Sequence, residues 1–143
     1  MFFVAIGSFF ALLTFIHFFS DWIFQTHSEA MIKHNNWKIR AKHCLIYTFI
    51  FIPFLYSFKL NLLEMFVSAN LLFWSHFYFD TYHSVFLWAK YIRKPPEMNQ
   101  ADKKAGFVNF VSTPLGKILM IAIDQISHIA FLLPIAYFAA KHV

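Results

Sequence analysis

Three polar side chains, spaced four residues apart, interrupt the long apolar run that begins the chain. His17, Asp21 and Gln25 are separated by aromatic and aliphatic residues in the segment FIHFFSDWIFQ. Positions i, i+4 and i+8 share one face of an α-helix, so these side chains form a polar ladder with steps of about 6 Å. An Asp at the centre of a helix in lipid costs roughly 2.5 to 3.5 kcal/mol. The ladder therefore requires polar partners from other helices.

The same spacing occurs twice more along the chain. His76 and Asp80 repeat the His-x3-Asp pair, and Asp124 and His128 carry it in reverse order. Each pair lies among apolar residues that offer it no local partner. We therefore expect the three stretches to meet, together with His43, inside one membrane bundle.

The composition is typical of integral membrane proteins. Of the 143 residues, 59% are hydrophobic and 22% aromatic, whereas only 13% are charged. A water-soluble domain has about 25% charged residues. We expect a single transmembrane domain over residues 1–143 with an all-α fold.

Four apolar stretches predict four transmembrane helices in one bundle. The helices are expected at about residues 1–24, 43–58, 62–91 and 115–140, with basic loops at 26–42 and 92–114. About 20 apolar residues are needed to cross roughly 30 Å of hydrocarbon. The first stretch lacks the basic start of a signal peptide, so we expect it to be retained as a span.

The distribution of basic residues predicts the orientation of the bundle. Most Lys and Arg residues lie in 26–42 and 92–114, whereas the turn between the second and third helices has only Lys59 and the C-terminal tail only Lys141. Basic loops stay on the cytoplasmic side. We therefore expect a multi-pass inner-membrane protein with both termini in the periplasm and the polar ladders in the cytoplasmic half of the bilayer.

The polar residues have the composition of a catalytic metal centre. Imidazole and carboxylate donors without Cys favour Zn, Mn or Fe, and donors from several helices can hold one or two ions. The predicted ligands are His17, Asp21, His43, His76, Asp80, Asp124 and His128. Asp21, Asp80 and Asp124 are also the candidate catalytic carboxylates, because an Asp without metal can act as the general base toward a metal-bound water. Gln25 and Gln125 are weak ligands and are expected to orient the others.

The order of these motifs resembles a family of small bacterial and phage membrane proteins of unknown function. Its pattern is H-x3-D-(F/W)-x2-Q, a single His, H-x3-D and D-Q-x2-H, and this chain follows it from His17 to His128. The family is similar in appearance to predicted membrane-bound metal-dependent hydrolases. By that analogy the resemblance implies hydrolysis with a divalent metal, although the family itself has no established reaction.

Several functions fit this sequence. We expect a metal-dependent hydrolase acting on a lipid or phosphate-bearing substrate, because the predicted site lies beside basic loops. The alternatives are a small transporter or proton relay whose His and Asp side chains titrate, a haem protein with two His ligands, and a phage or bacterial envelope factor whose ladders only join helices. Membrane lipids are the expected partners, and the sequence leaves open whether the protein forms a homo-oligomer. The net charge of +5 is explained by the loops and anionic headgroups, so no nucleic acid is expected.

Overall fold

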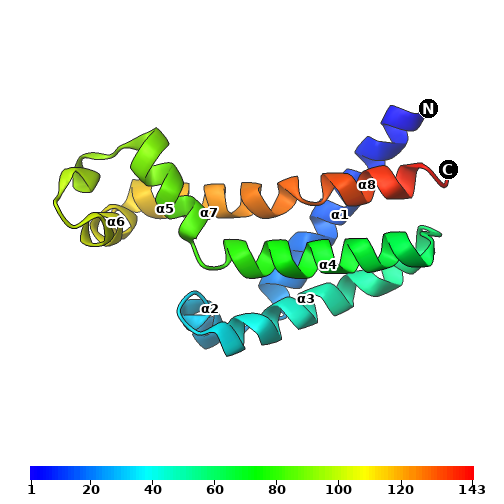
Figure 1. Cartoon of the computed structure of the whole chain (residues 1–143), viewed down its shortest axis with the longest axis horizontal. Coiled ribbons are helices and arrows are strands. Elements are labelled where there is room, and N and C mark those ends of the chain that lie inside the picture. Colours follow the sequence, from blue (N-terminus) through cyan, green and yellow to red (C-terminus); the bar gives the residue numbers. More distant parts are fainter.

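The protein is built of helices alone, as the sequence predicts. The computed structural model describes residues 1–143 and contains no β-strand. The bundle consists of α1 (Phe2–Ile23), α3 (Trp37–Ser57), α4 (Leu62–Phe79), α7 (Pro114–Ala130) and α8 (Leu133–Ala140), with α7 and α8 nearly continuous (Figure 1). The shorter elements are α2 (His27–Ile32), α5 (His83–Trp88), the π-helical turn η1 (Ala89–Arg93), the 3-10 turn η2 (Pro96–Asn99) and α6 (Lys103–Ser112).

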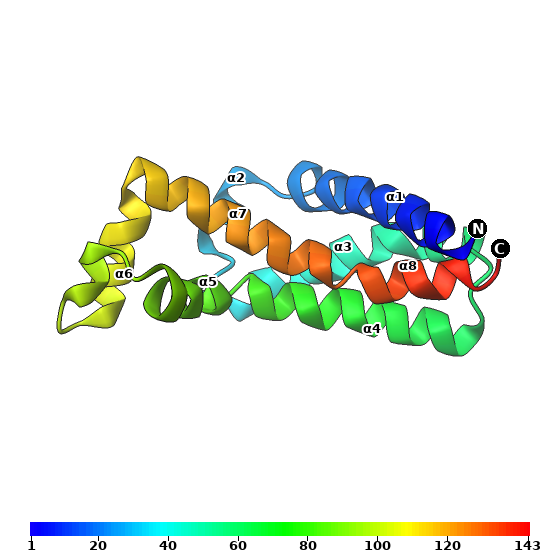
Figure 2. The ribbon, with the colours of Figure 1, turned by 90° about the horizontal axis from the view of Figure 1, so that it is seen from above.

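The two ends of the bundle differ in what they carry. Both chain termini and the tight turn between α3 and α4 lie at one end, whereas α2, α5 and α6 lie toward the other (Figure 2). The basic segments 26–42 and 92–114 belong to this second end. We refer to it as the basic end of the bundle.

Three helical segments, not four, are long and apolar enough to span a membrane. They are Phe2–Ile23, Trp37–Ser57 and Pro114–Ala140, and their length and apolar composition are those of membrane-spanning helices. The prediction of four spans is therefore wrong for α4. This helix packs along α3, but Glu64, Asn70 and His76 make it too polar to qualify by itself. Its buried polar side chains, Ser68 and His76, face the other helices rather than the outside of the bundle.

Two helix boundaries differ from those predicted. Helix α3 begins at Trp37 instead of His43, because the Asn36 side chain accepts hydrogen bonds from the backbone N–H groups of Lys38 and Ile39 and so caps the helix. Pro53 lies inside α3 without ending it. Near the C-terminus, α7 ends at Ala130 and α8 starts at Leu133, since Pro134 cannot donate to the preceding turn.

The predicted helix over residues 62–91 is broken after Phe79. Asp80 ends α4, and Tyr82 has a φ of 57°, a left-handed conformation that stops the helix before α5 begins at His83. Neither Gly nor Pro marks this break in the sequence. A left-handed conformation at a bulky residue costs about 1 to 2 kcal/mol, so contacts elsewhere must hold the turn.

The half of the bundle nearer the termini has an apolar core. Twelve buried residues form one cluster there: Leu13, Ile16, Tyr47, Phe51, Leu55, Phe58, Leu60, Leu72, Leu132, Ile135, Ala136 and Ala139. The outward faces are apolar as well, and Phe3, Phe49 and Phe66 point away from the bundle. A surface of this kind is stable when hydrocarbon covers it.

Helices α6 and α7 meet at a corner that only glycine can form without displacement. A Cβ atom at Gly116 would overlap the carbonyl oxygen of Phe110 and lie 2.8 Å from the Thr113 hydroxyl. The hydroxyl of Thr113 in turn accepts a hydrogen bond from the Gly116 N–H and caps α7. The corner fixes the direction in which α7 enters the bundle.

We predict that Gly116→Ala lowers the free energy of unfolding by about 2 kcal/mol, because the backbone of Phe110 must move to admit the methyl group. Gly7→Ala is the matched control, since a Cβ at Gly7 meets nothing within 4 Å and Ala favours the helix. Unfolding in mild detergent with increasing denaturant measures both. Equal stability of the two variants would contradict the tight corner.

Candidate metal centre

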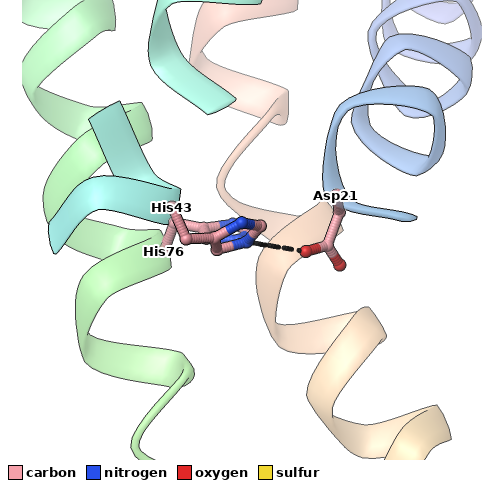
Figure 3. A group of neighbouring side chains, drawn as sticks. All are labelled: Asp21, His43 and His76. Atoms are coloured by element: carbon pink, nitrogen blue, oxygen red, sulfur yellow. Dashed lines mark hydrogen bonds and ion pairs between the residues drawn. The ribbon is translucent and has the colours of Figure 1, made fainter. Parts of the chain in front are cut away.

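The predicted polar ladders meet in the half of the bundle nearer the basic end. Asp21 lies in the last turn of α1, His43 in the second turn of α3, and His76 in the last turn of α4. All three are buried, with exposed fractions of at most 4%. Asp21 points across the bundle toward the two imidazoles (Figure 3). The four-residue spacing thus places these groups on helix faces that oppose one another.

Three donor atoms of this group converge on one point. Asp21 Oδ1 lies 3.0 Å from His43 Nε2 and 3.3 Å from His76 Nε2, and the two Nε2 atoms are 2.9 Å apart. A tetrahedral zinc site with bonds of about 2.05 Å has donor atoms about 3.3 Å apart. Two imidazole nitrogens at this separation cannot both face each other with bare lone pairs, so either a proton or a metal ion lies between them. The three residues therefore fit a metal ion.

A second group of donors shares His76. It adds Asp80 from the end of α4 and His128 from α7, and its ligand atoms all lie within 4.8 Å of one another. Nδ1 of His128 lies 2.8 Å from the backbone carbonyl oxygen of Asp124 and donates to it. With the proton on Nδ1, Nε2 of the neutral His128 ring carries a free lone pair that could bind a metal, and it has no hydrogen-bond partner. A backbone carbonyl commonly orients metal-binding imidazoles in this way.

Lys33 enters the same cluster from outside the long helices. Its Nζ lies 2.8 Å from Asp80 Oδ1, 3.6 Å from Asp21 Oδ1 and 3.3 Å from His43 Nε2. Lys33 follows α2 and is only 6% exposed. Burial lowers the pKa of its ammonium, but the charges of Asp80 and Asp21 outweigh this effect and raise the pKa above its ordinary value. Lys33 is therefore a buried cation at physiological pH.

Gln125 connects the first donor group to a neighbouring hydrogen-bond chain. Its amide nitrogen donates to Asp21 Oδ2 at 3.1 Å, and its oxygen accepts from His17 Nε2 at 3.0 Å. The Tyr47 hydroxyl donates to the other ring nitrogen of His17 at 2.9 Å. Both His17 nitrogens are therefore engaged, and His17 positions Gln125 instead of joining either donor group. Gln125 therefore contacts Asp21 from the side of His17, and its orienting role stays a prediction.

Two other predicted residues lie outside both donor groups. Asp124 is buried, and its Oδ2 lies 3.4 Å from the Gln125 amide nitrogen and 3.9 Å from Nδ1 of His128. Its Oδ1 has no hydrogen-bond partner. Gln25, which follows the end of α1, makes no hydrogen bond to the cluster through its buried amide nitrogen. Asp124 therefore adjoins the site, whereas Gln25 does not contribute to it.

Two residues of the site, Lys33 and Arg40, do not follow from the ladder pattern, whereas a third residue that was not predicted, Tyr47, does. Lys33 lies in a polar, basic stretch of the sequence, where a lysine is expected to be exposed to solvent. Arg40 binds the backbone carbonyls of Lys33 and His34 at 3.1 and 3.0 Å and so anchors the segment that carries Lys33. Tyr47 did have a sequence signal, because it follows His43 by the same four residues that separate the members of each ladder.

The turn after α4 closes the site from the side of α5. Tyr82 lies beside His34, with ring centroids 5.4 Å apart, and connects the turn to the segment after α2. Burial raises the pKa of the Tyr82 phenol, and the nearby charge of Asp124 acts in the same direction. The break in the predicted helix thus brings the α2 segment and the α4–α5 turn together over the buried carboxylates.

The chain belongs to a family of proteins of unknown function, DUF3307, whose model matches residues 9–143. The match confirms the predicted resemblance to a family of unknown function. It does not test the similarity to membrane-bound hydrolases. No curated protein and no solved structure matches the chain significantly. The chemistry of the site must therefore be argued from its own residues.

We predict that Lys33→Met lowers the free energy of unfolding by about 3 to 5 kcal/mol in metal-free protein, because it leaves buried carboxylates without their cation. Added Zn²⁺ should restore much of this loss. Lys42→Met is the matched control, since Lys42 pairs with Glu29 at 2.6 Å on the exposed surface, and little change is expected. Unfolding in detergent measures both variants. A Lys33→Met protein as stable as Lys42→Met would show that the carboxylates do not depend on Lys33.

Proposed function

We propose that this protein is a membrane-embedded, metal-dependent hydrolase. A divalent ion, Zn, Mn or Fe, is held by Asp21, His43 and His76, and Asp80 and His128 complete the coordination or hold a second ion. The observation that supports this most directly is the convergence of Asp21 Oδ1, His43 Nε2 and His76 Nε2 within 3.3 Å of one another.

The balance of buried charge supports the same proposal. Asp21, Asp80 and Asp124 are buried beside one buried ammonium, that of Lys33. The other buried cation, Arg40, binds backbone carbonyls and stacks on Phe77 rather than pairing with a carboxylate. With neutral imidazoles and all three carboxylates ionised, the cluster would carry two uncompensated negative charges, which are costly in an apolar bundle. A divalent cation neutralises them.

Hydrolysis is the reaction that this set of residues serves best. When bound, a divalent metal acidifies a coordinated water and polarises a carbonyl or phosphoryl oxygen. Asp124 lies outside the donor groups, its Oδ1 has no hydrogen-bond partner, and its Oδ2 lies 3.9 Å from Nδ1 of His128. It is therefore our candidate for the general base. Lys33 supplies a positive charge at the same place, which suits a phosphate-bearing substrate.

We further propose that the basic end faces the cytoplasm. The segments 26–42 and 92–114 lie at this end, and both termini lie at the other, so the termini would be periplasmic in an inner-membrane protein. The metal centre would then lie in the cytoplasmic half of the membrane and receive its substrate from the inner leaflet.

One specific observation favours a second candidate, a structural protein without a metal. The Lys33 ammonium already contacts both Asp21 and Asp80, so the cluster can join α1, α3 and α4 through ion pairs alone. In that case the protein would be an envelope factor and the polar ladders would only stabilise its bundle. Metal content separates this candidate from a metalloenzyme.

We predict that protein purified in mild detergent without chelator contains stoichiometric metal, and that His43→Ala and His76→Ala each weaken metal binding by more than about 100-fold. His27→Ala is the control, because His27 is exposed in the polar segment before α3 and bonds none of these ligands. Elemental analysis gives the content, and melting with and without chelator gives the stabilisation. If the purified wild-type protein contains no metal and added Zn²⁺ or Mn²⁺ does not change its melting temperature, the structural candidate is favoured.

We predict that Asp124→Asn keeps its metal but slows hydrolysis by about 100-fold or more, as the loss of a general base does. Metal-loaded protein in phospholipid vesicles is incubated, and the released products are identified by mass spectrometry. Asp102→Asn, at the cap of α6, is the matched control that should keep full activity. Metal-loaded protein that releases no product from phospholipids or other phosphate esters would show that the ion is structural.

A further inference from the structure

A long apolar groove runs along the outer face of α3. It has a volume of about 830 Å³ and is walled by Leu45, Ile46 and Phe49 on α3, with Phe24 from the end of α1. These α3 residues lie on a different face from His43 and Tyr47, which are buried toward the metal centre. The groove is thus separate from the donor groups and opens on the surface that lipid would cover.

The groove is charged at one end only. Lys38 and Lys42 line it in the first two turns of α3, next to Trp37, and the rest of its lining is apolar. From Lys38 to Phe49 the helix rises about 16 Å, close to the depth of one leaflet, since the hydrocarbon core is roughly 30 Å thick. The dimensions and polarity of the groove therefore match those of a phospholipid lying along α3.

The two lysines differ in the partners they have. Lys42 Nζ lies 2.6 Å from Glu29 Oε1 and is largely neutralised. Lys38 makes no salt bridge, and its ammonium lies 5.9 Å from the centre of the Trp37 ring. An exposed lysine beside an exposed tryptophan is typical of the headgroup region, where the ammonium meets lipid phosphates. Lys38 is the group at this end that lacks an anion.

We propose that this groove binds one anionic phospholipid, with the headgroup phosphate at Lys38 and an acyl chain along Leu45 and Phe49. The site goes beyond the proposed hydrolase and does not depend on it, because no metal-binding residue lines the groove. The positive charge of Lys38 favours phosphatidylglycerol over a zwitterionic lipid, since each lysine near an anionic headgroup contributes about 1 kcal/mol.

Native mass spectrometry of the full chain, released from nanodiscs of phosphatidylglycerol or phosphatidylcholine, tests the site. Wild-type protein should retain one phosphatidylglycerol and much less phosphatidylcholine. Lys38→Gln should reduce retention of phosphatidylglycerol about fivefold, the ratio that corresponds to one such lysine. Ala41→Trp, which fills the groove from its wall, should abolish retention of either lipid.

Lys90→Gln is the matched control. Lys90 also belongs to the basic end and lies 4.7 Å from the ring of its neighbour Tyr91, but it does not line the groove, so lipid retention should not change. Melting temperatures verify that each variant is folded, and Lys38 is exposed enough for its replacement to leave the fold intact.

Three results would overturn the site. They are equal retention of the two lipids by the wild type, unchanged retention in Lys38→Gln, and a protein dimer or an inorganic phosphate adduct in place of the lipid adduct. Metal content does not enter any of these readouts. Failure of the lipid site therefore leaves the proposed hydrolase untouched, and the converse also holds.

Discussion

Two carboxylates buried in an apolar bundle, Asp21 and Asp80, set the condition that the rest of the structure must meet. Each would cost several kcal/mol if left unpaired, because neither lipid nor apolar side chains solvate it. The helices therefore assemble around them. Imidazoles arrive from α3, α4 and α7, and the one available ammonium, Lys33, reaches in from the segment after α2. The register of the helices follows from these contacts as much as from apolar packing.

This condition also explains the irregular parts of the fold. Helix α4 ends at Asp80, and the left-handed Tyr82 turns the chain so that the carboxylate stays inside while α5 leaves toward the basic end. Arg40 ties down the segment that carries Lys33 by binding its backbone carbonyls. The left-handed backbone at Tyr82 and the burial of Arg40 both cost free energy. The contacts of Asp21 and Asp80 with Lys33 and the imidazoles offset this cost.

The sequence predicts which polar side chains share a helix face, but not the irregular segments that surround them. A four-residue period is a local property of a helix, and it correctly places His76 and Asp80 on one face of α4, toward Asp21. Lys33 could not be found in this way, because its contact with Asp80 joins a polar loop to a distant helix end, and no period relates the two. The end of α4 could not be predicted either, because Tyr82 takes a left-handed conformation at a position where Gly would be expected.

The division of the bundle into a polar and an apolar half bears on the proton relay or transporter that the sequence left open. A path across the membrane needs titratable or polar groups at every depth. Toward the termini, however, the buried side chains form a continuous apolar cluster that includes Leu13, Phe51 and Ile135, packed between α1, α3 and α8. The buried titratable groups are instead gathered at one level, whereas the Glu64–His142 pair near the termini lies at the surface. Such a concentration of donors in one half of the bundle suits a site that binds and holds an ion, and it leaves the other half to anchor that site in the membrane.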